Sequence, residues 1–131
     1  MVIFVDTSAT YALLDADDPN HRPASDALRR HLDDGRFVTH NYVVLESIAL
    51  IQRRLGLRFV RAFTQRLVPL LEVAWVDRPR HERAVTDLVA SRQRRVSLVD
   101  RISFDFMREH EIRTAFTFDG DFAREGFTVL D

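Results

Sequence analysis

Four acidic residues lie in segments that otherwise have the composition of a protein core. Asp6, Glu46, Asp100 and Asp119 occur in the stretches VIFVDTS, YVVLESIALI, SLVDRISF and AFTFDGDF. Burying one unpaired carboxylate costs several kcal/mol or forces the group to take up a proton. Four such positions in one short chain suggest that something offsets this cost, and a divalent cation is the simplest candidate.

Each acid also has an ordinary structural explanation. Asp6 precedes a predicted helix and can cap it, and Asp119-Gly120 is a common turn dipeptide. Asp100 stands three residues after Ser97, which approximates a capping box, although the box favours Glu or Gln. Glu46 can belong to a narrow solvent-facing stripe of its helix. Taken singly, these signals are weak.

Taken together, the acids predict a cluster of oxygen ligands supplied by separate elements. Asp6 and Asp119 each follow a predicted strand, and ligands of open parallel sheets gather at the carboxyl ends of strands. Glu46 is surrounded by apolar residues in nearly every helical direction, so we expect its helix to be buried on most sides and Glu46 to face a cleft. Oxygen-only sites of this kind suit Mg²⁺ or Mn²⁺, with Asp121 as a possible additional ligand.

The elements that must position these acids alternate between short apolar strands and helices. We predict strands over residues 2–5, 37–39, 73–76, 115–118 and 127–130. We predict helices over residues 9–15, 23–34, 41–55, 58–71 (interrupted or ended near Pro69), 80–92 and 97–110. This order predicts an α/β protein, a sandwich with a mainly parallel sheet, and the 131 residues are expected to form a single domain.

Composition narrows the class of protein. No window has the roughly 18 apolar, uncharged residues of a membrane span, and the segment MVIFVDTS is not expected to be a signal peptide. The absence of cysteine excludes disulfides and thiolate metal sites and fits a reducing cytoplasm. We therefore expect a cytoplasmic protein that does not enter the membrane.

The basic residues are all arginine, although the net charge is only −1. Seven of the 19 lie between Arg78 and Arg101. Arginine suits bidentate contact with phosphate, so Arg92, Arg94 and Arg95 are candidate RNA-binding residues. A solvated helix face explains the same cluster, and the sequence leaves both interpretations open.

Several other chemistries lack their motifs. The chain contains no phosphate-binding G-x-x-x-x-G-K-[ST], no G-x-G-x-x-G and no G-x-S-x-G, and neither His-Glu pair continues to H-E-x-x-H. The five histidines have no ligand spacing, and we expect them at the surface or at an interface. They are His21, His31, His40, His81 and His110.

Four motifs in this order resemble the PIN-domain ribonucleases, specifically the VapC-type toxins of bacterial toxin–antitoxin pairs. They are FVDTSA (4–9), NYVVLES (41–47), SLVDRISFDFM (97–107) and TFDGDF (117–122), and the resemblance covers essentially the whole chain. It implies a three-layer α/β/α sandwich and a metal site of Asp6, Glu46, Asp100 and Asp119, with Asp121 a possible fifth ligand. It also implies that hydroxyls of Thr7 or Ser8 and of Thr117 orient the acids or water.

The resemblance further implies Mg²⁺- or Mn²⁺-dependent hydrolysis of phosphodiester bonds in structured RNA, such as transfer RNA or ribosomal RNA. A cognate antitoxin whose peptide covers the acidic cleft, and a homodimer, are the expected partners. Two alternatives remain: a catalytically silent RNA-binding or regulatory module, and a phosphatase acting on small substrates. The second is disfavoured because Thr7-Ser8 follows Asp6, where a haloacid-dehalogenase-type enzyme has D-x-D.

Overall fold

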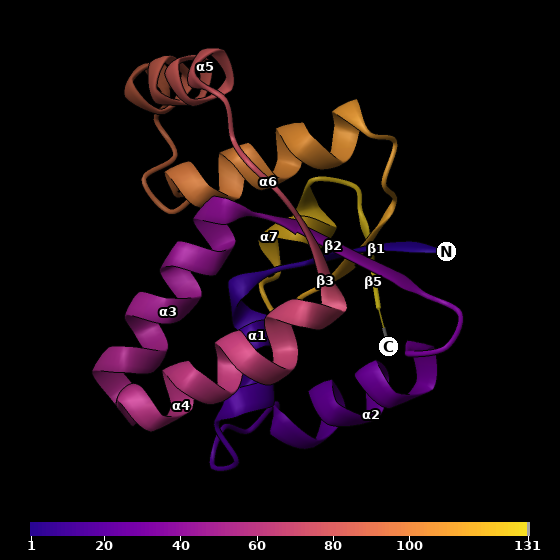
Figure 1. The fold of residues 1–131 in the computed structure, drawn as a ribbon. Coiled ribbons are helices and arrows are strands. Elements are labelled where there is room, and N and C mark those ends of the chain that lie inside the picture. Colours follow the sequence, from indigo (N-terminus) through magenta and orange to yellow (C-terminus); the bar gives the residue numbers. More distant parts are fainter. Residues whose placement is uncertain (131) are drawn as a thin grey trace.

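The computed structural model describes residues 1–130 and is built around one five-stranded sheet (Figure 1). The spatial order is β3-β2-β1-β4-β5, and all four strand pairs are parallel. The strands are β1 (Val2–Val5), β2 (Arg36–His40), β3 (Leu71–Ala74), β4 (Thr114–Phe116) and β5 (Thr128–Val129). Asp131, the last residue of the predicted domain, lies outside the described residues.

Strand β1 lies at the centre of the sheet, and side chains from both of its faces are buried. Phe4 belongs to an apolar cluster with residues of the C-terminal helices, whereas Ile3 and Val5 pack with the N-terminal helices. Successive side chains of a strand point to opposite faces, so an unbroken apolar run is what a strand covered on both sides requires. The predicted sandwich with its parallel sheet is therefore confirmed.

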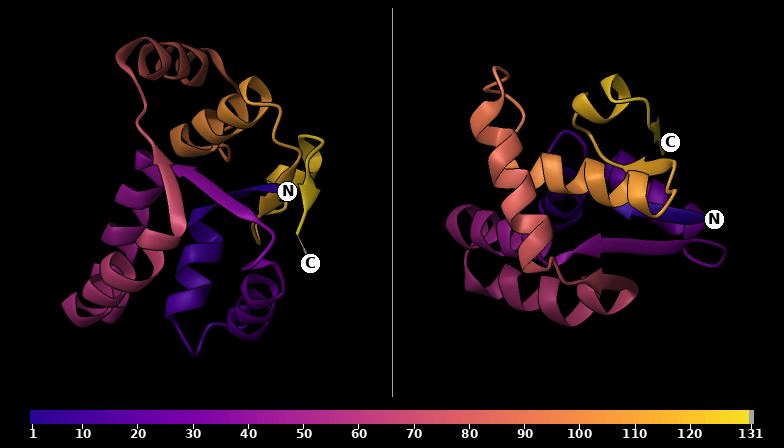
Figure 2. Two further views of the ribbon diagram at one scale, coloured as in Figure 1. Left: turned by 45° about the vertical axis from the view of Figure 1, so that its right-hand side comes forward. Right: turned by 90° about the horizontal axis from the view of Figure 1, so that it is seen from above.

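The helices form the outer layers of the sandwich (Figures 1 and 2). Helices α1 and α2 lie on one side of the sheet, α5 and α6 lie on the other, and α3 and α4 form a corner beside the sheet. No helix within residues 1–130 has the length and apolar character needed to cross a membrane. The helices are α1 (Thr7–Leu14), α2 (His21–His31), α3 (Asn41–Leu55), α4 (Leu57–Ala62), α5 (Arg78–Ala90), α6 (Leu98–Glu109) and α7 (Asp121–Arg124).

The predicted helix over residues 58–71 is only partly correct. Helix α4 is followed by a π-helical turn, η1 (Phe63–Leu67), and a 3-10 turn, η2 (Val68–Leu70), and β3 then begins at Leu71 rather than at residue 73. Pro69 has no backbone N–H and cannot continue an α-helix, so the chain changes its hydrogen-bond pattern before it enters the strand.

Other differences occur at element ends, where side-chain caps decide the boundary. Helix α1 begins at Thr7, two residues before the predicted start, because Asp6 caps it. Helix α5 begins at Arg78 because Asp77 accepts a hydrogen bond from the N–H of Arg80 at 2.9 Å. The short helix α7 was not predicted, since Asp-Gly-Asp indicates a turn.

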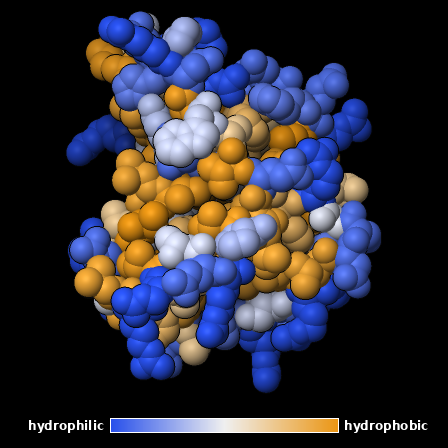
Figure 3. Space-filling model, in the orientation of Figure 1, coloured by the Kyte–Doolittle hydropathy of each residue, from blue (hydrophilic) through white to orange (hydrophobic). Residues whose placement is uncertain are grey.

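Helix α3 is less buried than its composition predicts. Its buried residues are Val43, Ser47 and Ile51, whereas the side chain of Leu45 is 66% exposed. Trp75, directly after the edge strand β3, is 80% exposed. Figure 3 shows a belt of apolar surface across the middle of this face. The expectation that α3 is buried on most sides was therefore wrong.

Candidate active site

Asp6 follows the central strand β1 and begins α1. Its N–H donates to the carbonyl of Phe116 at 3.0 Å, which extends the pairing of β1 with β4 to the last residue before the helix. Its Oδ2 accepts hydrogen bonds from Ser8 Oγ at 2.8 Å, Thr117 Oγ1 at 3.0 Å and Ser8 N at 3.4 Å. The capping role and the convergence of two strand ends are thus both present in the structure.

The Asp6 carboxylate is almost completely buried, with 4% of the residue exposed. Burial raises its pKa above the ordinary value, and the hydrogen bonds from Ser8 and Thr117 act in the opposite direction. Ser8 and Thr117 are hydroxyls that the resemblance assigned an orienting role, whereas Thr7 Oγ1 is buried without a hydrogen-bond partner among residues 1–130. The two hydroxyls fix one oxygen of a carboxylate that still lacks a compensating positive charge.

Asp100 lies in the first turn of α6 and completes a capping box with Ser97. The N–H of Asp100 donates to Ser97 Oγ at 3.1 Å, and the N–H of Ser97 donates to Asp100 Oδ2 at 3.4 Å. Burial, followed by the negative charges of Asp6 and Asp119, raises the pKa of Asp100 to about 6. Asp6 and Asp119, which are distant in sequence, therefore both lie close enough to Asp100 to repel its charge.

Asp119 and Asp121 follow β4 in a tight turn. The N–H of Asp119 donates to Thr117 Oγ1 at 3.0 Å, and the N–H of Asp121 donates to Asp119 Oδ1 at 2.9 Å. One carboxylate oxygen from each of Asp100, Asp119 and Asp121 lies within 4.8 Å of the others. Such a group of mutually repelling hard oxygen donors, beside the buried Asp6, fits a divalent cation such as Mg²⁺ or Mn²⁺.

Glu46 is half-buried on α3 and is not part of that compact group. Its neighbour Ser47 is buried and donates to Thr10 Oγ1 at 2.6 Å, which joins α3 to α1. The structure thus ties the helix of Glu46 to the helix that begins at Asp6. A ligand role for Glu46 stays a prediction.

His40 was expected at the surface or at an interface, but it is completely buried at the end of β2. Its Nδ1 accepts from the N–H of Val43 at 3.4 Å, so Nε2 carries the proton and donates to Ser103 Oγ at 2.9 Å. Ser103 in turn donates to the carbonyl of Val99 at 2.8 Å. Burial lowers the pKa of His40 to about 4, so a neutral imidazole links the start of α3 to the turn that carries Asp100.

The predicted RNA-binding arginines differ in their surroundings. Arg95 Nε lies 3.4 Å from Asp121 Oδ1, whereas Arg92 and Arg94 are exposed and form no ion pair with any residue in the range 1–130. Arg124 also pairs with Asp121 Oδ1. Arg124 was not predicted from the sequence as a site residue. Its spacing of three residues from Asp121, within one helical turn, was the available signal.

Comparisons with known proteins show the family and the fold of this chain. A family model described as PIN domain matches residues 3–127. The 23S rRNA-specific endonuclease VapC20 of Mycobacterium tuberculosis is 38% identical over 131 residues, 98% of each chain. The crystal structure of that VapC20, a sarcin–ricin loop cleaving toxin, matches with a TM-score of 0.85 and 36% identity over 96% of each chain.

More distant structures share the fold alone. FitAcB from Neisseria gonorrhoeae matches with a TM-score of 0.67 at 18% identity and covers 100% of this chain and 97% of its own. PAE2754 from Pyrobaculum aerophilum matches with a TM-score of 0.59, also at 18% identity, over 98% of this chain and 89% of its own.

The repulsion around Asp100 predicts a stability effect that depends on pH. Because its pKa is about 6 in the folded protein and 3.8 in the unfolded chain, the folded state loses stability from this group as pH rises from about 4 to 6. Asp100→Asn keeps an oxygen for the capping box but cannot ionise. We expect this variant, without metal at pH 7.5, to melt about 5 °C above the unsubstituted protein, with the difference disappearing near pH 4.

Added Mg²⁺ provides the matched control in the same melting experiment. It should stabilise the unsubstituted protein and stabilise Asp100→Asn much less, because one ligand charge is gone. If Asp100→Asn and the unsubstituted protein have equal melting temperatures at pH 7.5 and respond equally to Mg²⁺, Asp100 is not part of a cation site formed by neighbouring carboxylates.

Proposed function

Because this chain belongs to the PIN domain family, we propose that it is a metal-dependent endoribonuclease and the toxin of a toxin–antitoxin pair. It acts as a single domain in the cytoplasm. The observation that carries the proposal is the group of Asp100, Asp119 and Asp121 oxygens within 4.8 Å of one another, beside the buried Asp6. The likeness to the 23S rRNA-specific endonuclease VapC20 supports ribosomal RNA over transfer RNA as the substrate, with the sarcin–ricin loop as the first sequence to test.

The residues proposed to hold Mg²⁺ or Mn²⁺ are Asp6, Asp100 and Asp119, with Asp121 and Glu46 as further ligands. Bound there, the cation supplies a Lewis acid that offsets the negative charge developing on the phosphoryl group. The protein contributes carboxylates whose positions are already fixed. Ser8 and Thr117 orient Asp6, the capping box orients Asp100 and the turn after β4 orients Asp119, so little reorganisation accompanies the reaction.

Removing one charge from this site should stop catalysis without unfolding the protein. We expect Asp6→Asn and Asp100→Ala each to lower Mg²⁺-dependent cleavage of a sarcin–ricin loop RNA by at least about 100-fold. Asp33→Asn, a change at an exposed acid outside the site, is the control and should cleave normally.

The measurement is the single-turnover rate of appearance of cleaved RNA ends, made on variants with native melting curves. Undiminished cutting by Asp6→Asn would remove the site assignment. Binding of the RNA with no cleavage by the unsubstituted protein would favour the catalytically silent module instead.

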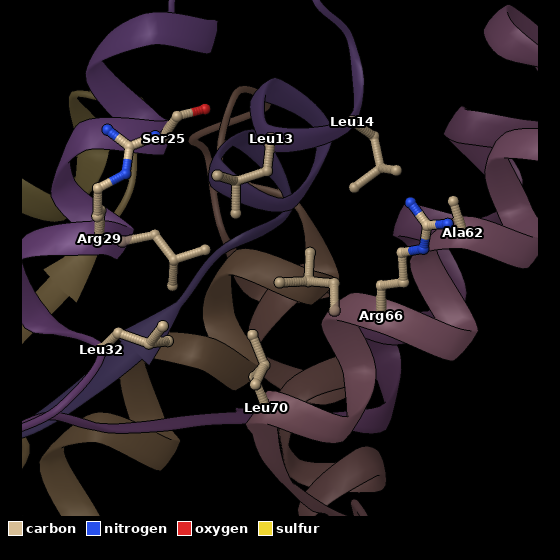
Figure 4. A pocket seen from close by; sticks show the side chains of 10 residues that line it. Leu13, Leu14, Ser25, Arg29, Leu32, Ala62, Arg66 and Leu70 are labelled. Carbon is tan, nitrogen blue, oxygen red and sulfur yellow. The ribbon is translucent and has the colours of Figure 1, made fainter.

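The antitoxin peptide is expected to cover the acidic cleft, and a groove separate from that cleft offers the same partner a second contact (Figure 4). Helices α1 and α2 and the segment α4–η2 line this groove, whose volume is about 450 Å³. Leucines dominate its lining, and Arg29 and Arg66 approach from opposite sides. An amphipathic antitoxin segment with acidic residues beside its apolar face complements this pattern, and we assign the groove to it.

Leu70 lines the groove and is 44% exposed, so it can be changed with little damage to the core. We expect Leu70→Glu to weaken binding of the cognate antitoxin by at least about tenfold, measured by calorimetry. Leu57→Glu, on α4 but outside the groove, is the control. Equal affinities for Leu70→Glu and the unsubstituted protein would show that the groove has another occupant.

Exposed large apolar side chains beside the edge strand β3 support a homodimer. Asn41 Oδ1 accepts from the N–H of Val76 at 2.6 Å, which holds the segment after β3 against the start of α3. The exposed Trp75 and Leu45 therefore lie on adjoining elements beside the edge strand β3. A second copy that presents the same patch would cover both side chains in a two-fold interface.

Trp75→Glu places a charge in the middle of the proposed interface. We expect the unsubstituted chain to sediment with the mass of two chains at about 10 µM, and Trp75→Glu to dissociate at least about ten times more readily. Val89→Glu, a change at a residue of α5 that is also 80% exposed, should sediment normally. A monomeric unsubstituted chain of 15.3 kDa at that concentration would reject the dimer.

A further inference from the structure

Asp121 is a nearly buried carboxylate with two guanidinium partners. It begins α7, is 5% exposed, and its Oδ1 pairs with Arg124 Nη1 and lies 3.4 Å from Arg95 Nε. Its Oδ2 accepts no hydrogen bond from residues 1–130, so that oxygen remains free for a cation shared with Asp100 and Asp119. The single negative charge of Asp121 thus lies beside the two positive charges of Arg95 and Arg124, so these three side chains together carry a net positive charge.

The two guanidiniums keep most of their donors for another ligand. The side chain of Arg95 is 68% exposed and that of Arg124 is 60% exposed, and each uses one nitrogen on Asp121. A guanidinium carries five N–H donors in a planar arrangement that matches phosphate oxygens. Within residues 1–130, no other arginine forms an ion pair with Asp6, Asp100, Asp119 or Asp121.

The loop that carries Arg95 is attached to the helix that carries Asp100. Arg101, the next residue of α6, donates from Nη2 to Ser91 Oγ at 2.7 Å, and the N–H of Gln93 donates to the same oxygen at 3.0 Å. Helix α7, which carries Arg124, packs on α6 through Phe122 and Phe104, whose ring centroids are 4.9 Å apart. Both arginines are therefore positioned relative to α6, the helix that carries Asp100.

We propose that Arg95 and Arg124 form a phosphate-binding fork for the RNA backbone at the edge of the acidic cluster, and that Asp121 positions this fork. The inference rests on the proposed function, since it names how that site receives its substrate. Three neighbouring carboxylates repel a phosphodiester, and a pair of guanidiniums at their edge offsets this repulsion where the backbone enters.

Substitutions of two acids distinguish the positioning role of Asp121 from simple charge repulsion, because the two explanations predict opposite changes in RNA affinity. Without metal, loss of any negative charge near the RNA should strengthen binding if Coulomb repulsion alone decides it. Asp119→Asn should therefore bind RNA more tightly than the unsubstituted protein. Asp121→Asn should bind RNA more weakly, because it releases the two arginines from their positions.

The experiment measures binding of a fluorescent sarcin–ricin loop RNA by anisotropy, with the full chain, in EDTA and across a salt series. We expect Arg95→Gln and Arg124→Gln each to weaken binding about fivefold and to lower the slope of log affinity against log salt by about one. Arg124→Lys keeps the charge but not the planar fork, and should lose affinity with little change in slope. Arg58→Gln, on α4, should bind normally.

Unchanged affinity and slope in Arg95→Gln and Arg124→Gln would overturn the fork, as would tighter binding by Asp121→Asn. Melting curves show whether a variant that binds RNA weakly is still folded. If Arg124→Gln does not fold, the affinity of Arg124→Lys is used in its place. Cleavage by the unsubstituted protein with Mg²⁺ is scored independently. If the fork fails while carboxylate-dependent cleavage persists, only this inference is lost.

Discussion

The burial of the Asp6 carboxylate at the end of the central strand is the constraint on which the rest of the site depends. An uncompensated charge at that depth opposes folding, and two hydroxyls on one of its oxygens compensate it only in part. Ser8 and Thr117 come from α1 and from the end of β4, so the same bonds that satisfy Asp6 also align the strand that leads to Asp119. Stability and site geometry are thus determined by the same few contacts.

Buried polar pairs extend this alignment to the remaining elements. The Thr10–Ser47 hydroxyl pair joins α1 to α3, and the chain from His40 through Ser103 joins α3 to the first turn of α6. The Thr10–Ser47 and His40–Ser103 hydrogen bonds are buried, and a buried hydrogen bond with a fixed direction determines how two helices pack. The cost is that Asp100 is partly buried beside other carboxylates, and its burial, followed by the charges of Asp6 and Asp119, raises its pKa. Stability lost at a functional site in this way is common in enzymes.

Much of this arrangement could be predicted from the sequence, because strand ends and caps are local signals. The acids at positions 6 and 119 follow apolar runs, and a parallel sheet brings such ends to one edge.

The burial of His40 could not be predicted, since it depends on the aromatic side chains of Phe4 and Phe106 that pack around it. The exposure of α3 was missed because the composition of an apolar helix does not show whether other elements of the fold cover it. The π-helical turn at Phe63–Leu67 reflects hydrogen bonding upstream of Pro69 that residue types alone do not specify.

The most direct test of this account is a titration of the metal-free protein with Mn²⁺, with free Mn²⁺ measured by electron paramagnetic resonance. We predict saturable binding of at least one ion per chain at pH 7, weaker binding at pH 5 where Asp100 is protonated, and a large loss of affinity in Asp119→Asn. Binding that does not saturate, or that is equally strong in Asp119→Asn, would show that these carboxylates do not form a cation site.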